Sequence, residues 1–128
     1  MKNYKTYFQI KAEPQDVYTA LTNPFTIELW SGESAVMSTE VGAEFSLWSG
    51  DIVGKNIELI ENEKLVQQWY FGDDDDESPS IVTIKIWPRN TVSSVEILHT
   101  NIPDEAYDNI VEGWNEAYLG AVKALLEV

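Results

Sequence analysis

The chain has 128 residues, of which 44% are hydrophobic, and a formal net charge of −14 from 8 basic and 22 acidic side chains. This length and composition fit one folded domain with one core, so we expect residues 1–128 to form a single domain. With one arginine, Arg89, and no lysine cluster, the chain lacks the basic surface that nucleic acid or an anionic membrane requires. We therefore exclude both as partners.

Cysteine is absent, which excludes disulfides, thiolate catalysis and cysteine-based metal sites. The segment Met1–Lys5 is not followed by an apolar run, so we expect no signal peptide. No stretch approaches the roughly 20 apolar residues of a membrane-spanning helix. By elimination, we expect a cytoplasmic protein.

The first quarter of the chain predicts one strand and two short helices. Residues 4–11 alternate between apolar and polar side chains, as in a half-buried strand. Pro14 opens a short helix, and Asn23-Pro24 ends it because proline disfavours α geometry in the residue before it. A second helical turn is predicted at 25–29.

The middle of the chain, residues 34–100, carries only strand and turn signals. The predicted strands are 35–37, 43–48, 52–60, 64–71, 81–87 and 92–100. Ser49-Gly50-Asp51 is a tight turn of the kind that closes a hairpin, and Gly54 indicates a bulge or a bend in its strand. Consecutive hairpins predict an antiparallel sheet with one face available for burial.

The last segment, from about Pro103 to Val128, predicts a helix. Apolar side chains recur there at steps of three and four: Tyr107, Ile110, Val111, Trp114, Ala117, Tyr118, Ala121, Val122 and Leu125. This spacing places them on one side of a helix of roughly 24 residues and about 36 Å, which would cover the apolar face of the sheet.

A stripe of small residues runs along this predicted helix: Ala106, Gly113, Ala117, Gly120 and Ala124. Each interior glycine costs about 1 kcal/mol relative to alanine, so the two glycines need a reason. One interpretation is close approach to a neighbouring strand. The other is open space above the sheet, where a ligand could enter.

Four groups of residues, taken in chain order, resemble one known family. They are Phe8, Ile10, Pro14, Val17, Tyr18, Leu21, Thr22, Asn23 and Trp30; then Gly42, Phe45, Gly50, Ile52 and Gly54; then Val66, Gln67 and Trp69; and finally His99, Pro103, Gly113 and Trp114. Together they resemble the C-terminal domain of the activator of heat shock protein 90 ATPase, the Aha-type family of the START-like (SRPBCC) superfamily.

The resemblance implies an α+β helix-grip fold. In this fold a curved antiparallel sheet of about six to seven strands wraps around the long C-terminal helix, and two short helices follow the first strand. Eukaryotic co-chaperones of the family carry an extra N-terminal domain that contributes much of the chaperone contact, and we expect none here. ATPase activation therefore does not transfer with the fold, because function resides in sites.

Aromatic residues suggest a ligand pocket between the last helix and the sheet, since apolar cavities with a few polar groups are the usual small-molecule sites. The predicted lining is Trp30, Phe45, Trp69, Phe71, Ile84, Ile97, His99, Trp114 and Tyr118. The alternative is that these side chains simply fill the core. Alternation does not assign Trp48 and Trp87 to either face.

His99 is the only histidine and shares a predicted strand face with Val95 and Ile97. One interpretation is a hydrogen-bonded core residue. The other is a polar anchor for a ligand or a general acid–base group.

An acidic run follows the strand at 64–71 and consists of Asp73, Asp74, Asp75, Asp76 and Glu77. It lacks the alternating ligands, the glycine and the distal glutamate of an EF-hand, so we predict no metal site. The run is either a solvated hairpin tip or an acidic contact loop for a basic partner.

Catalytic motifs are missing from the sequence: there is no glycine-rich phosphate loop, no nucleophile elbow and no histidine pair. The ionisable groups of the central strands are Glu58, Glu96 and His99. We predict no catalytic residue and no cofactor.

Three functions remain open, in this order of preference. The first is a binding module for a small hydrophobic molecule or a client surface, favoured by an open aromatic cavity. The second is a reduced co-chaperone that contacts a chaperone ATPase, favoured by a filled core and an exposed apolar patch. The third is an enzyme of the polyketide cyclase or aromatase kind, favoured by ionisable groups converging in a wet cavity.

Overall fold

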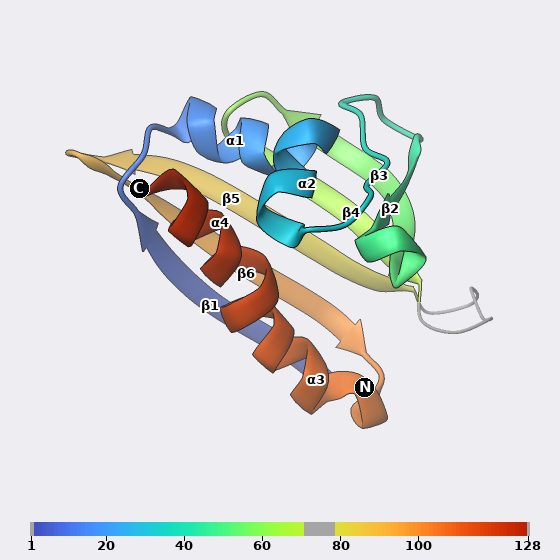
Figure 1. Cartoon of the computed structure of the whole chain (residues 1–128). Coiled ribbons are helices and arrows are strands. Elements are labelled where there is room, and N and C mark those ends of the chain that lie inside the picture. Colours follow the sequence, from blue (N-terminus) through green and yellow to red (C-terminus); the bar gives the residue numbers. More distant parts are fainter. Residues whose placement is uncertain (1, 71–78, 128) are drawn as a thin grey trace.

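Six antiparallel strands form one curved sheet in the computed structural model, which describes residues 2–70 and 79–127 (Figure 1). The strands are β1 (Lys2–Ile10), β2 (Glu44–Leu47), β3 (Ile52–Ile60), β4 (Lys64–Tyr70), β5 (Ser80–Arg89) and β6 (Val92–Ile102). Their order across the sheet is β1-β6-β5-β4-β3-β2, so the first strand of the chain pairs with the last. The predicted α+β helix-grip architecture is confirmed.

The inner face of the sheet is built by the alternation that the sequence shows. Val82, Ile84 and Ile86 of β5 are each at most 3% exposed, and so are their neighbours on β6. The predicted strand at 35–37 is wrong: only Val36 forms a bridge, to Ser46.

Gly54 is paired on both sides, with Phe45 of β2 and Trp69 of β4. A Cβ at this position would lie 1.9 Å from the Gln68 carbonyl oxygen and 2.7 Å from the Phe45 ring. The register shift of β3 lies further along, between Asn56 and Glu58. Gly54 therefore marks a close approach of the backbone, while the irregularity predicted there occurs two residues later.

Two short helices, α1 (Pro14–Thr22) and α2 (Pro24–Ser31), follow β1 and confirm the predicted break at Asn23. The Asn23 side chain caps α2, accepting hydrogen bonds from the amides of Phe25 at 2.9 Å and Thr26 at 3.1 Å. The Trp30 indole donates to the Ala20 carbonyl at 2.8 Å, which ties the two helices together.

The last helical segment is not one regular α-helix. It comprises a 3₁₀ turn (η2, Asp104–Ala106), α3 (Tyr107–Glu112), a π-helical turn (η3, Gly113–Tyr118) and α4 (Leu119–Leu126). Tyr118 and its neighbour Leu119 are both buried, whereas Ala117 is exposed. The prediction that Ala117 lies on the buried side is wrong because the wide turn rotates the helix face.

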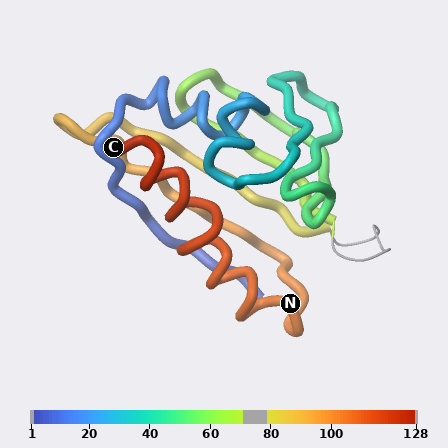
Figure 2. The backbone as a smooth tube through the Cα atoms, viewed as in Figure 1, coloured from blue at the N-terminus to red at the C-terminus, as the bar shows by residue number. Residues whose placement is uncertain are grey.

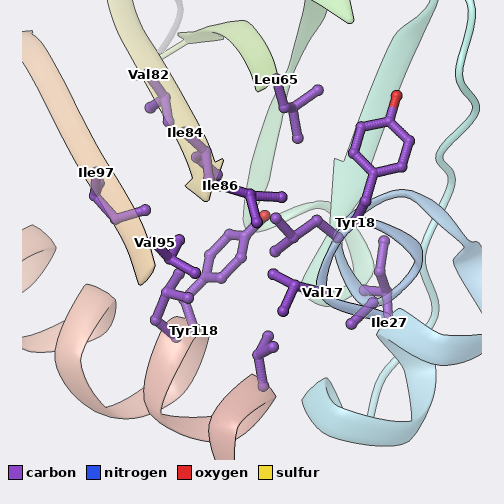
Figure 3. Packing of buried hydrophobic residues seen from close by; sticks show 14 of the residues in the cluster. Val17, Tyr18, Ile27, Leu65, Val82, Ile84, Ile86, Val95, Ile97 and Tyr118 are labelled. Atoms are coloured by element: carbon purple, nitrogen blue, oxygen red, sulfur yellow. The ribbon is translucent and has the colours of Figure 1, made fainter. Parts of the chain in front are cut away.

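All the helices cover the same face of the sheet. In Figure 2 the last segment, in orange and red, runs alongside β1 and β6, with α1 and α2 beside it in blue. Figure 3 shows the resulting core, in which the Tyr118 ring lies between Val17 of α1 and Ile86 and Val95 of the sheet, with Ile27 of α2 beyond Val17. No helix within 2–70 and 79–127 is long and apolar enough to cross a membrane.

Candidate functional site

A cleft of about 290 Å³ opens between the last helical segment and the turn η1 (Trp48–Gly50), which joins β2 to β3. Its lining residues are Trp48, Asp51, Ile52, Trp69, Asn109, Ile110, Gly113, Trp114, Ala117 and Tyr118. The lining is mainly apolar, with one carboxylate and one side-chain amide. This combination is typical of a small-molecule site.

Larger hollows lie elsewhere on the surface, among them the following two. One of about 590 Å³ lies between α1 and residues 37–39, and one of about 370 Å³ lies over β2 and β3. Neither is lined by the aromatic side chains beneath the last helical segment, whereas the cleft is. We therefore take the cleft as the candidate site.

The two glycines of the last segment have different structural reasons. A Cβ on Gly113 would meet nothing within 4 Å, so this glycine borders open space at the cleft. A Cβ on Gly120 would lie 2.3 Å from the Asn115 carbonyl oxygen, which belongs to the π turn of the same helix. Of the two interpretations of the small-residue stripe, open space fits Gly113, and close approach to a strand fits neither glycine.

Stacked aromatic rings form the floor of the cleft. The centroids of Trp69 and Trp114 are 5.1 Å apart at an interplanar angle of 21°, and those of Trp114 and Tyr118 are 4.6 Å apart. The Tyr118 ring also packs against Trp30 and Trp48, with centroid distances of 4.9 Å and 5.7 Å. These rings fill most of the space between the helix and the sheet, and the cleft is what they leave at one end.

The Val66-Gln67-x-Trp69 motif has a structural role in this floor. The Trp69 indole donates to Gln67 Oε1 at 3.1 Å, and Gln67 Nε2 donates to Asn56 Oδ1 at 3.0 Å. Asn56 Nδ2 in turn donates to the Ser38 carbonyl at 3.0 Å. This buried chain of amides fixes the Trp69 ring and anchors the loop that follows α2.

The predicted pocket residues fall into three groups. Trp69, Trp114 and Tyr118 line the cleft. Trp30, Ile84, Ile97 and His99 are buried in the core without lining the cleft, and Phe45 is buried at the hollow over β2 and β3 instead. Phe71 lies outside the described residues.

Sequence reasoning did not include Trp48, Asp51, Ile52, Asn109 and Ile110 in the site. Trp48 and Ser49 adopt positive φ angles of 50° and 54°, which turn this hairpin end toward the helix. Tryptophan and serine rarely adopt a positive φ angle, so the residue types here do not predict this conformation. The sequence signals for the cleft were the small residue at 113 and three of the predicted aromatic pocket residues, Trp69, Trp114 and Tyr118.

His99 is fully buried and neutral. The Trp114 indole N–H donates to its Nδ1 at 3.0 Å, so the proton of the neutral ring lies on Nε2, which faces Ser80 Oγ. Burial lowers the pKa of His99 to about 3. Between the two interpretations of this residue, the geometry fits the hydrogen-bonded core residue.

Tyr118 carries a buried hydroxyl that has no hydrogen-bond partner among the described residues. Figure 3 shows its ring reaching from the last helical segment to Ile86 on the sheet. Burial raises the pKa of this hydroxyl, so it stays protonated. It is the one polar group of the aromatic floor for which the described residues supply no partner.

The two carboxylates singled out in the central strands, Glu58 and Glu96, do not line the cleft. Glu96 accepts a hydrogen bond from the Tyr7 hydroxyl at 2.8 Å on the outer face, and this bond lowers the pKa of its carboxyl. Glu58 is exposed and pairs with Lys64 at 3.3 Å. The described residues contain no cluster that could hold a metal ion, and Asp73–Glu77 lies outside them.

Comparison with known proteins identifies the family. The model of the family described as "Activator of Hsp90 ATPase homolog 1-like protein" matches residues 11–127. The chain belongs to this family. The resemblance read from the four sequence motifs is thereby confirmed.

The relatives of this Aha1-like chain include "Activator of 90 kDa heat shock protein ATPase homolog" from Dictyostelium discoideum, 28% identical over 95% of this chain and 32% of the relative. A mouse homolog 2 of the same name is 23% identical over 89% of this chain and 34% of its own length. The chain thus spans about a third of the length of these curated relatives.

Among solved structures, an HSP90 activator from Plasmodium falciparum superposes with a TM-score of 0.89 at 25% identity. The match covers 98% of this chain and 96% of that one. The helix-grip arrangement of the Aha1-like chain is therefore shared over its whole described length.

Proposed function

We propose that this Aha1-like chain binds a small apolar molecule in the cleft beside Gly113. The observation that carries the proposal is the open space opposite this glycine, walled by aromatic rings beneath the last helical segment. Gly113 has no Cβ at the place where a ligand would enter. Glycine there makes the helix about 1 kcal/mol less stable than alanine would.

The size of the cleft limits the ligand. Its volume of about 290 Å³ lies at the lower end of the range of small-molecule sites, which is about 300–1,000 Å³. A molecule with one or two fused rings fits this space better than a sterol or a long acyl chain.

The lining supports binding rather than chemistry. Among the described residues that line the cleft, Asp51 is the one carboxylate, and His99 lies buried behind Trp114. General acid–base catalysis needs positioned groups with matched pKa values at the reacting atoms, and two such groups do not meet in this cleft.

The test compares two substitutions at one position. Gly113→Leu should fill the cleft, whereas Gly113→Ala should leave most of it open and the fold intact. Native mass spectrometry of the purified proteins should show a co-purified molecule on wild type and Gly113→Ala, and none on Gly113→Leu. An identical adduct on Gly113→Leu would place the ligand elsewhere, and its absence from all three would count against the proposal.

Contact with a heat-shock ATPase is the second candidate function, and one surface favours it. Phe25 and Leu29 lie four residues apart on α2 and are 77% and 73% exposed. Residues 12–54 contain seven acidic side chains and no lysine or arginine. Exposed apolar side chains on an acidic surface suit a partner that combines basic and apolar groups.

The second candidate is tested by adding the chain to a purified Hsp90-type ATPase and measuring its turnover. A Phe25→Ser/Leu29→Ser double variant should lose any stimulation that the wild type gives. Trp87→Ser is the matched control, because Trp87 is 44% exposed on the outer face of β5. Equal stimulation by all three proteins would exclude α2 as the contact.

A further inference from the structure

We infer that the cleft selects small planar ligands that carry a positive charge and discriminates against anionic ones. This inference rests on the proposed function and adds the charge class of the ligand.

The aromatic walls suit a cation. Trp48, Trp69, Trp114 and Tyr118 all line the cleft, and the face of each ring carries negative electrostatic potential. Trp69, Trp114 and Tyr118 are at most 3% exposed and pack closely on one another, whereas Trp48 is half-buried, so Trp48 presents the ring that a ligand reaches most easily. A cation within about 6 Å of such a face is attracted, most strongly by tryptophan.

Asp51 supplies the counter-charge. Its backbone N–H donates to the Trp48 carbonyl at 3.1 Å, which holds the residue at the edge of the cleft directly after η1. The ion pairs formed within 2–70 and 79–127 join Lys5 to Glu96, Lys64 to Glu58 and Lys123 to Glu127, and none of them uses Asp51. The carboxylate can therefore pair with a ligand cation, and the Asn109 amide oxygen can accept a second hydrogen bond.

An anionic ligand would find no positively charged side chain in this lining, because the lining residues of the described chain include no lysine, arginine or histidine. The helix segment 107–118 carries Asp108, Glu112 and Glu116 and no basic residue. Lys2 reaches the start of this segment, with its Nζ 4.9 Å from the centroid of the Tyr107 ring, but Tyr107 does not line the cleft. The local field thus favours cations and repels carboxylates and phosphates.

Three indoles of matched size test the inference: tryptamine, tryptophol and indole-3-propionate, which differ mainly in the charge at the end of a two-carbon arm. Their dissociation constants would be measured by NMR titration, following the Gly113 amide and the Trp48 and Trp114 indole protons. We expect tryptamine to bind about three- to tenfold more tightly than tryptophol, and indole-3-propionate to bind more weakly than tryptophol by a similar factor.

Matched variants separate the contribution of Asp51 from that of the net charge. Asp51→Asn should bring the tryptamine and tryptophol dissociation constants clearly closer together, while the aromatic rings keep part of the preference for tryptamine. Glu63→Gln removes the same charge from the β3–β4 turn, at the opposite end of β4 from Trp69, and should leave the ratio of these two constants unchanged. Asn109→Asp adds a second carboxylate at the cleft and should strengthen the preference for tryptamine over tryptophol.

The failure of the inference differs from the failure of the proposed function. Equal constants for the three indoles, or a preference for the propionate, would overturn the charge selectivity while leaving an apolar binding site. Equal effects of Asp51→Asn and Glu63→Gln would assign the selectivity to the net charge and overturn the role of Asp51. No binding by any of the three would overturn both the inference and the proposed site.

Discussion

His99 lies between Trp114, which donates to its Nδ1, and Ser80 at its Nε2, and its pKa is lowered to about 3 because burial disfavours the imidazolium form. In the unfolded chain the same group has its ordinary pKa of 6.5. Between these two values the unfolded chain binds a proton that the folded chain does not. The free energy of unfolding therefore falls as the pH falls through this window.

This linkage gives a pH prediction. Going from pH 7 to pH 5, His99 should lower the free energy of unfolding by about 2 kcal/mol. Glu96 does not interfere, because a carboxylate with a lowered pKa loses its contribution only below about pH 4.5. Urea unfolding at both pH values should show this loss in wild type and not in His99→Gln. The same pH dependence in both proteins would contradict the neutral, buried assignment.

Tyr118 gives the second prediction at this scale. Its hydroxyl is buried without a partner among the described residues, so Tyr118→Phe removes an uncompensated polar group and little packing. We expect the free energy of unfolding to rise by about 1 kcal/mol, measured by urea denaturation. A clear loss of stability in the variant would mean that the hydroxyl makes a favourable interaction.

At the scale of the element, the last helical segment shows which structural features the sequence could predict and which it could not. Its apolar spacing predicted a helix against the sheet, and Trp114, Tyr118 and Val122 are buried as expected. The π turn was not predictable, because it preserves every local preference and adds only one residue to a turn. The consequence is local: Leu119 replaces Ala117 on the buried side.

Replacing each of the two glycines of this segment by alanine should change the free energy of unfolding in opposite directions. Gly113 has helical angles of φ −60° and ψ −43° with free space around its Cβ, so Gly113→Ala should stabilise the protein by about 0.5–1 kcal/mol. Gly120→Ala should destabilise it by about 1–3 kcal/mol, because the Cβ meets the Asn115 carbonyl. The midpoints of thermal unfolding of both variants test this prediction. Equal shifts of the two midpoints relative to wild type would contradict the π-turn geometry.

For the molecule as a whole, the alternation of strands and the family motifs were enough to predict a sheet curved around a C-terminal helix. The aromatic residues predicted a pocket beneath this helix, but nothing in the sequence predicted that the cleft would open against the hairpin end at η1. That feature depends on Trp48 and Asp51 at a hairpin end approaching Asn109 and Ile110, more than 50 residues away in sequence. Such a juxtaposition depends on the curvature of the sheet and on the irregular backbone of η1, which local propensity does not encode.

The measurement that tests the account most directly is the position of a bound neutral indole, found from intermolecular NOEs with tryptophol. The account predicts NOEs to Ile110, Trp114 and Trp48, and their loss in Gly113→Leu. NOEs to Phe25 and Leu29 instead, or an unchanged pattern in Gly113→Leu, would contradict it.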